Sequence, residues 1–137
     1  MKDSGYYEKL PRRGSTESLL KYLKSNKFVA DAFMETEQTL IVRRPAKGDL
    51  RVHLTNLYIV GITDVHEILS EDPTINAIVT MSQWNGYTSL AKSLCSEQNV
   101  GVFKFSEFLG AAYHAGKKFV DYPPPSEEER EKRRRRY

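Results

Sequence analysis

The sequence predicts an α/β protein with a single mixed five-stranded sheet flanked by helices, and two hydrophobic patterns predict it. Between residues 28 and 60 apolar residues alternate with polar ones, as in half-buried antiparallel strands. Two later runs, 75–81 and 100–105, are continuously apolar, as in strands buried on both faces, and a helical pattern separates them. A strand, a helix and a strand in this order form a right-handed crossover with parallel strands. The sheet is therefore expected to begin antiparallel and to continue parallel, with helices on both faces.

The first element is expected to be a helix over residues 15–26. Ser15 is placed to cap its start, and Glu17 falls in the first turn, where the helix dipole favours an acid. Leucines at helical spacing give it one apolar face, and Asn26 is placed to end it. The leucines are Leu19, Leu20 and Leu23.

Three antiparallel strands follow this helix. The first carries small and apolar side chains on one face between residues 28 and 34, and the second is QTLIVRR at 38–44. Pro45 and Gly48 predict a hairpin turn before the third strand, which alternates from residue 50. The alternation slips after Thr55-Asn56, so a bulge or a break is expected there.

The second half is expected to supply helix 62–72, strand 75–81, helix 87–97, strand 100–105 and a last helix from residue 106. Thr63 and Ser106 are placed to cap the first and last of these helices. The two apolar strands are expected to be parallel and to lie at or next to the centre of the sheet.

The chain divides into one domain with two tails. Residues 1–14 are expected to form an N-terminal arm, 15–121 the α/β domain, and 122–137 a tail that is first Pro-rich and then charged. An apolar content of 39% is enough for a hydrophobic core.

The charge distribution and the single cysteine narrow the class of protein. Residues 1–14 carry four basic and two acidic groups, 127–137 carry six and four, and 15–126 carry eleven and twelve. The excess positive charge therefore sits at the ends, whereas a nucleic-acid surface usually needs a basic face on the folded part. No run approaches the ~20 apolar residues of a membrane span. One cysteine, Cys95, and no apolar leader favour a cytoplasmic protein without membrane contact.

The C-terminal unit carries a family resemblance. AIVTMS is an apolar strand that ends in Thr and Ser, and YTSLAKSLCSEQNVGVFKFSEFLGAA supplies an alanine-bearing helix, a short apolar strand and a closing helix. With the order of the elements over residues 15–115, this resembles the restriction-endonuclease-like, PD-(D/E)xK fold, in particular its Mrr-like branch. The resemblance implies an acid near the second strand, a D/E-x-K pair in the third, and often a Glu on the first helix, which together bind Mg²⁺ and activate water.

The third strand departs from that pattern. It offers Arg51-x-His53 and His53-x-Thr55 where the family has D/E-x-K, and it carries no carboxylate. A rearranged site is still conceivable, with acids and a lysine drawn from neighbouring elements. Its weak candidates are Glu17, Glu37, Asp49 and Lys47. The favoured interpretation is a nuclease fold without a nuclease site and without a cofactor; Mg²⁺ would be the cofactor if the chain were a nuclease.

The stretch SQWNGYT, residues 82–88, is the strongest candidate for a binding site. Asn85 is expected to cap helix 87–97, which would leave backbone amides free to bind a phosphate or carboxylate. Trp84 and Tyr87 could flank the bound group and stack on a base, with Trp84 partly buried beneath the turn. The free amides would be those of Gly86, Tyr87 and Thr88. The alternative is structural: Trp84 plugs the core, and Ser82 bonds local backbone rather than acting as a nucleophile.

Arginines supply the remaining candidates for an anion. Arg43 and Arg44 end the second strand, and they contact either phosphate or only solvent. The tail 127–137 forms either a solvated helix or a tether for a polyanion. The arginines of that tether are Arg133, Arg134, Arg135 and Arg136. Cys95 and the three histidines are expected to be structural.

Three functional hypotheses follow. The first is a catalytically inactive nuclease-fold domain that binds nucleic acid or a nucleotide, or serves a nucleic-acid-processing or defence system. The second is an active, metal-dependent nuclease with a rearranged site. The third is a protein-interaction module or homodimer in which Tyr6, Tyr7 and the Pro-rich tail contact a partner.

Overall fold

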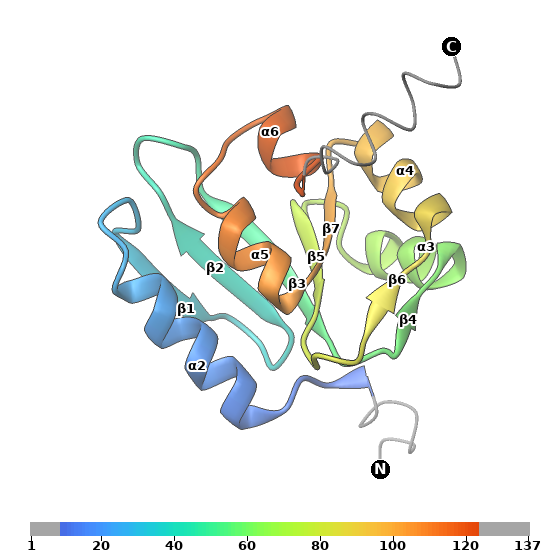
Figure 1. The fold of residues 1–137 in the computed structure, drawn as a ribbon, viewed down its shortest axis with the longest axis horizontal. Helices are drawn as coiled ribbons and strands as arrows, with labels where there is room; N and C mark the ends of the chain where they lie inside the picture. Colours follow the sequence, from blue (N-terminus) through green and yellow to red (C-terminus); the bar gives the residue numbers. More distant parts are fainter. Residues whose placement is uncertain (1–8, 124–137) are drawn as a thin grey trace, which may run out of the picture.

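The computed structural model describes residues 9–123 and shows one mixed sheet with helices on both faces (Figure 1). Its five strands lie in the order β1-β2-β3-β5-β7. Strands β1 (Asp31–Met34), β2 (Thr39–Arg43) and β3 (Leu50–Thr55) are antiparallel neighbours, whereas β5 (Ala77–Thr80) and β7 (Gly101–Lys104) continue the sheet in parallel. The predicted α/β class and mixed five-stranded sheet are therefore confirmed.

The helices bury two separate apolar clusters against the sheet. On one face lie α2 (Arg13–Lys24), α5 (Phe105–Ala111) and α6 (Lys117–Val120), which pack on alternate residues of β2 and β3 such as Leu40 and Val52. On the other face lie α3 (Ile62–Glu71) and α4 (Ser89–Glu97), which cover β5 and β7 through Ile78 and Val102. None of the helices within residues 9–123 is long and apolar enough to cross a membrane.

The strand that begins at Leu50 breaks where its alternation slips. After Thr55 the chain leaves the main sheet, and β4 (Ile59–Val60) pairs in parallel with β6 (Gly86–Tyr87) in a small second sheet. The predicted break at Thr55-Asn56 is confirmed, but the sequence did not predict the second sheet. A pair of two-residue strands is too short to leave a periodic signal.

The edge position of β7 corrects the expectation that both parallel strands are central or next to central. The two strands are parallel neighbours as predicted, but β7 is the last strand of the sheet. Its continuous apolar pattern comes from helices on both faces, which bury Val102 and Phe103 whether or not another strand pairs outside. Lys92 Nζ also donates to Val102 O at 2.7 Å, which satisfies one carbonyl of this strand.

Three predicted helix caps are wrong. Helix α2 begins at Arg13 with Arg12 as its N-cap, α3 follows Gly61, and α5 follows Lys104. The backbone amide of the residue before each of the last two helices donates instead to an acidic side chain three residues later. Gly61 N donates to Asp64 at α3, and Lys104 N donates to Glu107 at α5. The hydroxyls of Ser15, Thr63 and Ser106 therefore do not cap these helices. The expected last helix is also divided, because the chain turns at Gly116, where φ is 61°, between α5 and α6.

Candidate functional site

A pocket of about 610 Å³ opens where β3 and β5 end. Three chain segments line it: the start of α2, the link after β3, and the turn after β5. The carboxyl ends of parallel strands in an open α/β sheet are where ligands commonly bind. The lining residues among those described are Arg12, Ser15, Asn56, Tyr58, Met81, Ser82, Gln83, Trp84 and Asn85.

Hydrogen bonds from the sheet hold residues 9–12, the segment that ends in Arg12. Lys9 O accepts from Asn56 N and from Thr55 Oγ1, both at 2.9 Å, and from Gln38 Nε2 at 3.2 Å. Figure 1 shows this segment crossing the end of the sheet before it enters α2. Residues 9–12 are thus attached to the domain, and Arg12 lies beside the turn after β5.

A partly buried polar network joins the other two walls. Asn85 Nδ2 donates to Asn56 O at 3.1 Å and to Asn56 Oδ1 at 3.0 Å, and Ser82 Oγ donates to the same Oδ1. Asn85 is buried, so this role fixes its side chain. The predicted N-cap at Asn85 is wrong. Helix α4 starts later, and Thr88 caps it by accepting from Ala91 N at 3.1 Å.

The predicted cradle of free amides is also wrong. Gly86 N donates to Tyr58 O at 2.8 Å and Thr88 N donates to Val60 O at 3.0 Å, because residues 86–87 form a strand rather than a helix start. Tyr87 points elsewhere: its hydroxyl donates to Glu107 at 2.9 Å. Burial, and then the bond to this carboxylate, raises the pKa of Tyr87.

Trp84 is not buried beneath the turn as expected. Its side chain is 78% exposed, and Tyr58 across the pocket is 68% exposed. An exposed tryptophan gains little for folding, so both rings are available to a ligand. Of the described lining residues none is acidic, and Arg12 is the one cation. The pocket thus offers two aromatic faces, one guanidinium and several amides, a set that suits an anionic ligand with a flat ring.

Arg44 cannot contact phosphate. Its guanidinium is buried and donates to the carbonyls of Ala112 and His114 at 2.8 Å each, and to those of Lys47 and Gly48 in the hairpin. Burial lowers the pKa of Arg44. Its neighbour Arg43 is exposed, pairs with Asp49 at 3.5 Å and lies over the ring of Phe33. Neither arginine lines the pocket at Trp84.

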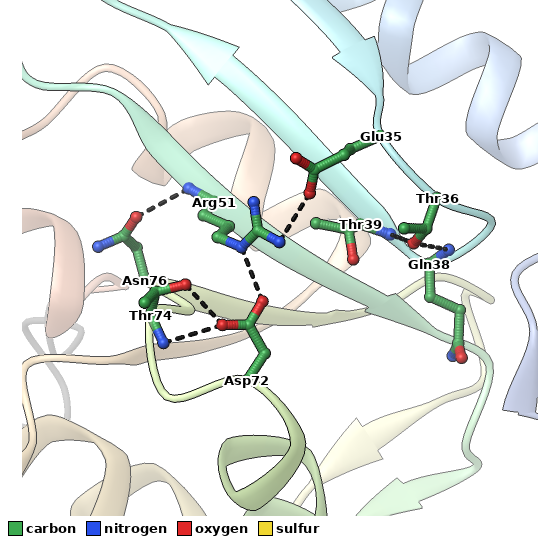
Figure 2. Close-up of polar contacts among 8 residues, drawn as sticks. All are labelled: Glu35, Thr36, Gln38, Thr39, Arg51, Asp72, Thr74 and Asn76. Carbon is green, nitrogen blue, oxygen red and sulfur yellow. Dashed lines mark hydrogen bonds and ion pairs between the residues drawn. The ribbon is translucent and has the colours of Figure 1, made fainter.

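The strand face at Arg51-x-His53 is held by ion pairs (Figure 2). Arg51 donates to Glu35 at 2.6 Å and to Asp72 at 2.7 Å, which joins the end of β1 to the end of α3. The hydrogen bond that Arg51 donates to Glu35, followed by the one that it donates to Asp72, raises the pKa of Arg51. Bonds from Thr74 and then Arg51 lower the pKa of Asp72 to about 2. His53 is half-buried on the same face, and burial lowers its pKa to about 4.

The four weak catalytic candidates do not converge. Glu17 lies exposed on α2 and pairs with Arg13 at 3.2 Å. Glu37 lies in the turn before β2, whereas Lys47 and Asp49 lie in the turn after it, at the opposite end of that strand. Within residues 9–123 no group of three or more His, Cys, Asp or Glu side chains is arranged to hold a metal ion. Tyr6, Tyr7 and the arginines of 133–136 lie outside the described residues.

Sequence reasoning missed Arg12, Asn56 and Tyr58. A signal for two of them was present, because the break at Thr55-Asn56 marks the end of a strand parallel to the one that ends before Ser82. Arg12 could not be found in this way, since only the bonds to Lys9 O place it there. No family model, curated protein or solved structure matches this chain.

Proposed function

We propose that this chain is a catalytically inactive nuclease-like domain that binds nucleic acid or a nucleotide in the pocket between Arg12 and Trp84. One observation carries the proposal: an exposed tryptophan and an exposed arginine, 72 positions apart, line the same pocket at the carboxyl ends of two parallel strands. Stacking of a base on an aromatic side chain is worth about 1–3 kcal/mol. Arginine binds phosphate through paired, charge-assisted hydrogen bonds.

The restriction-endonuclease-like assignment is part of this proposal. The order of helices and strands and the change from antiparallel to parallel pairing support it. The absence of catalysis is supported by the residues at the D/E-x-K position, where Arg51 and His53 replace the acid and the lysine. The carboxylates nearest to that position, Glu35 and Asp72, are both paired with Arg51.

A fluorescence titration tests binding directly. Trp84 is the single tryptophan of the chain, so any change in tryptophan emission reports this pocket. We expect nucleotides and short oligonucleotides to quench it, and Arg12→Gln to weaken binding. Arg13→Gln is the matched control, because Arg13 is adjacent and 94% exposed but does not line the pocket. Emission that is unchanged by inorganic phosphate, nucleotides and oligonucleotides would contradict the proposal.

A cleavage assay tests the proposal that the domain is catalytically inactive. We expect the purified protein not to cut DNA or RNA in the presence of Mg²⁺ or Mn²⁺. Turnover that disappears in Glu37→Ala or Asp49→Ala would instead establish a rearranged metal site and a nuclease.

A second candidate function, protein binding, is favoured by one surface. Within residues 9–123, five of the six exposed large apolar side chains come from residues 58–62 and 84–90. They are Tyr58, Ile59, Ile62, Trp84 and Leu90. The pairing of β4 with β6 brings the two segments together, and exposed apolar patches often mark protein interfaces. Light scattering on the wild type and on Ile59→Ser/Leu90→Ser tests it: a dimer that the double variant dissociates would establish self-association.

A further inference from the structure

Backbone and side-chain hydrogen bonds join the two chain segments that carry the exposed rings of the pocket. Tyr58 O accepts from Gly86 N at 2.8 Å, and Asn56 O accepts from Asn85 Nδ2 at 3.1 Å. These two bonds, one at Asn56 and one at Tyr58, join the segment that carries Tyr58 to the segment that carries Trp84. Both residues are more than two-thirds exposed. This is the arrangement of a stacking platform, on which bases lie only when their faces are free.

Among residues 9–123, Arg12 is the one cation that lines the pocket beside this platform. Arg12 lines the pocket from the start of α2, and among residues 9–123 no carboxylate pairs with it. Its neighbours are neutralised, since Lys9 pairs with Glu67 at 3.3 Å and Arg13 with Glu17 at 3.2 Å. The rest of the chain up to residue 126 has no excess of positive charge, because residues 15–126 carry eleven basic and twelve acidic groups. One cation beside two rings fits a single phosphate backbone and does not fit the two backbones of a duplex.

The side-chain donors of two lining residues are already engaged within the protein. Ser82 Oγ and Asn85 Nδ2 both donate to Asn56, so neither donor is free to read the edge of a base. Gln83 is an exposed amide at the rim of the pocket. Stacking discriminates weakly between bases, because every base presents a flat face.

From these three observations we infer that the ligand of the pocket is single-stranded nucleic acid, bound with little sequence preference. Bases stack on Trp84 and Tyr58 while a phosphate contacts Arg12. This inference rests on the proposed function and names its ligand class. Duplex DNA, whose base faces are covered by neighbouring pairs, binds weakly.

Fluorescence anisotropy with labelled single strands and with duplexes of the same sequence tests the inference. We expect single strands of thymidine or uridine to bind at least about tenfold more tightly than the duplex, and more tightly than the mononucleotide. Trp84→Ala and Tyr58→Ala each weaken binding about fivefold or more, whereas Trp84→Phe retains most of it. Arg12→Gln lowers the slope of log affinity against log salt by about 0.7.

Matched controls separate stacking from general effects. Leu90→Ala removes an apolar side chain that is as exposed as Tyr58 but lies outside the pocket, and Arg13→Gln removes a neighbouring cation. Both are expected to bind like the wild type. Because all of these side chains are exposed, the variants keep the fold, which circular dichroism checks.

The possible outcomes distinguish this inference from the proposed function. Equal or tighter binding of the duplex, or of mononucleotides alone, overturns the single-strand assignment and leaves a nucleic-acid or nucleotide site in place. Binding of single strands that Trp84→Ala and Arg12→Gln leave unchanged places the ligand elsewhere and overturns the inference. No binding of any of these ligands overturns both.

Discussion

Asn85 bridges two strand ends, because its side-chain amide donates to both the backbone and the side-chain oxygen of Asn56. Asn56 directly follows the last residue of β3, and Asn85 lies in the turn after β5. The shape of the pocket depends on this pair, since it sets how far the Tyr58 segment lies from the Trp84 segment.

Replacing Asn85 by Ala is expected to cost about 1–3 kcal/mol of unfolding free energy, because it removes the side-chain donor to Asn56 O and one of the two donors to Asn56 Oδ1. Thr88→Ala should cost about 1 kcal/mol, the usual value of an N-cap. Urea denaturation followed by far-UV circular dichroism measures both. Gln83→Ala is the control, an exposed amide in the same turn, and should change stability by less than about 0.5 kcal/mol. A larger loss for Gln83→Ala than for Asn85→Ala would contradict the buried bridge.

Arg44 is expected to be the most sensitive arginine of the described chain for stability. Arg44→Met keeps much of the volume but removes the donors to four carbonyls from two distant segments, so we expect a loss of about 3 kcal/mol or more. Arg43→Met, the matched control on the adjacent residue, removes an exposed ion pair with Asp49 and a cation–π contact with Phe33, and should cost less than about 1 kcal/mol. Thermal and urea unfolding of the pair would refute this account if the two losses were equal.

We expect the domain to lose stability in mild acid because of His53. Burial lowers its pKa from 6.5 to about 4, so the folded state favours the neutral ring. The unfolded chain binds the proton first, and the free energy of unfolding therefore falls as pH drops from 6.5 towards 4, by up to about 3 kcal/mol.

The His53 prediction can be checked by urea denaturation across that pH range. His53→Gln should remove most of the slope, and His66→Gln, which replaces an exposed histidine on α3, is the matched control. Asp72 acts in a separate, more acidic window, between 3.8 and about 2, where its lowered pKa also makes stability fall with pH. An unchanged slope in His53→Gln would show that another group titrates.

Cys95 should be inert towards thiol reagents in the native state. It is fully buried in α4, and burial raises the pKa of its thiol to about 11. We expect Ellman's reagent to modify it only as fast as the domain opens, so labelling should accelerate in Asn85→Ala in proportion to the stability lost. Immediate labelling of the folded wild type would mean that α4 does not pack on β5 and β7 as described.

Long, periodic helices and strands were predictable from the sequence, but the residues that cap the helices were not. The burial of the alternating strands around Leu50 and of the apolar run at 75–81 could be predicted from their hydrophobic patterns, because each residue of a strand faces one side of the sheet. The caps failed at Ser15, Thr63 and Ser106, since a capping side chain competes with backbone and acidic partners whose positions depend on the final fold.

The candidate site divides in the same way. The sequence by itself determined that the strand at 75–81 ends in a polar turn carrying Trp84 and Asn85, since strand period and turn residues are local properties. Only the tertiary structure decided that Asn85 bonds to Asn56, that residues 86–87 pair with β4, and that Arg12 reaches the pocket. These contacts join segments up to 72 positions apart. No local pattern encodes such a pairing, because it exists only once the whole sheet has brought the carboxyl ends of its strands together.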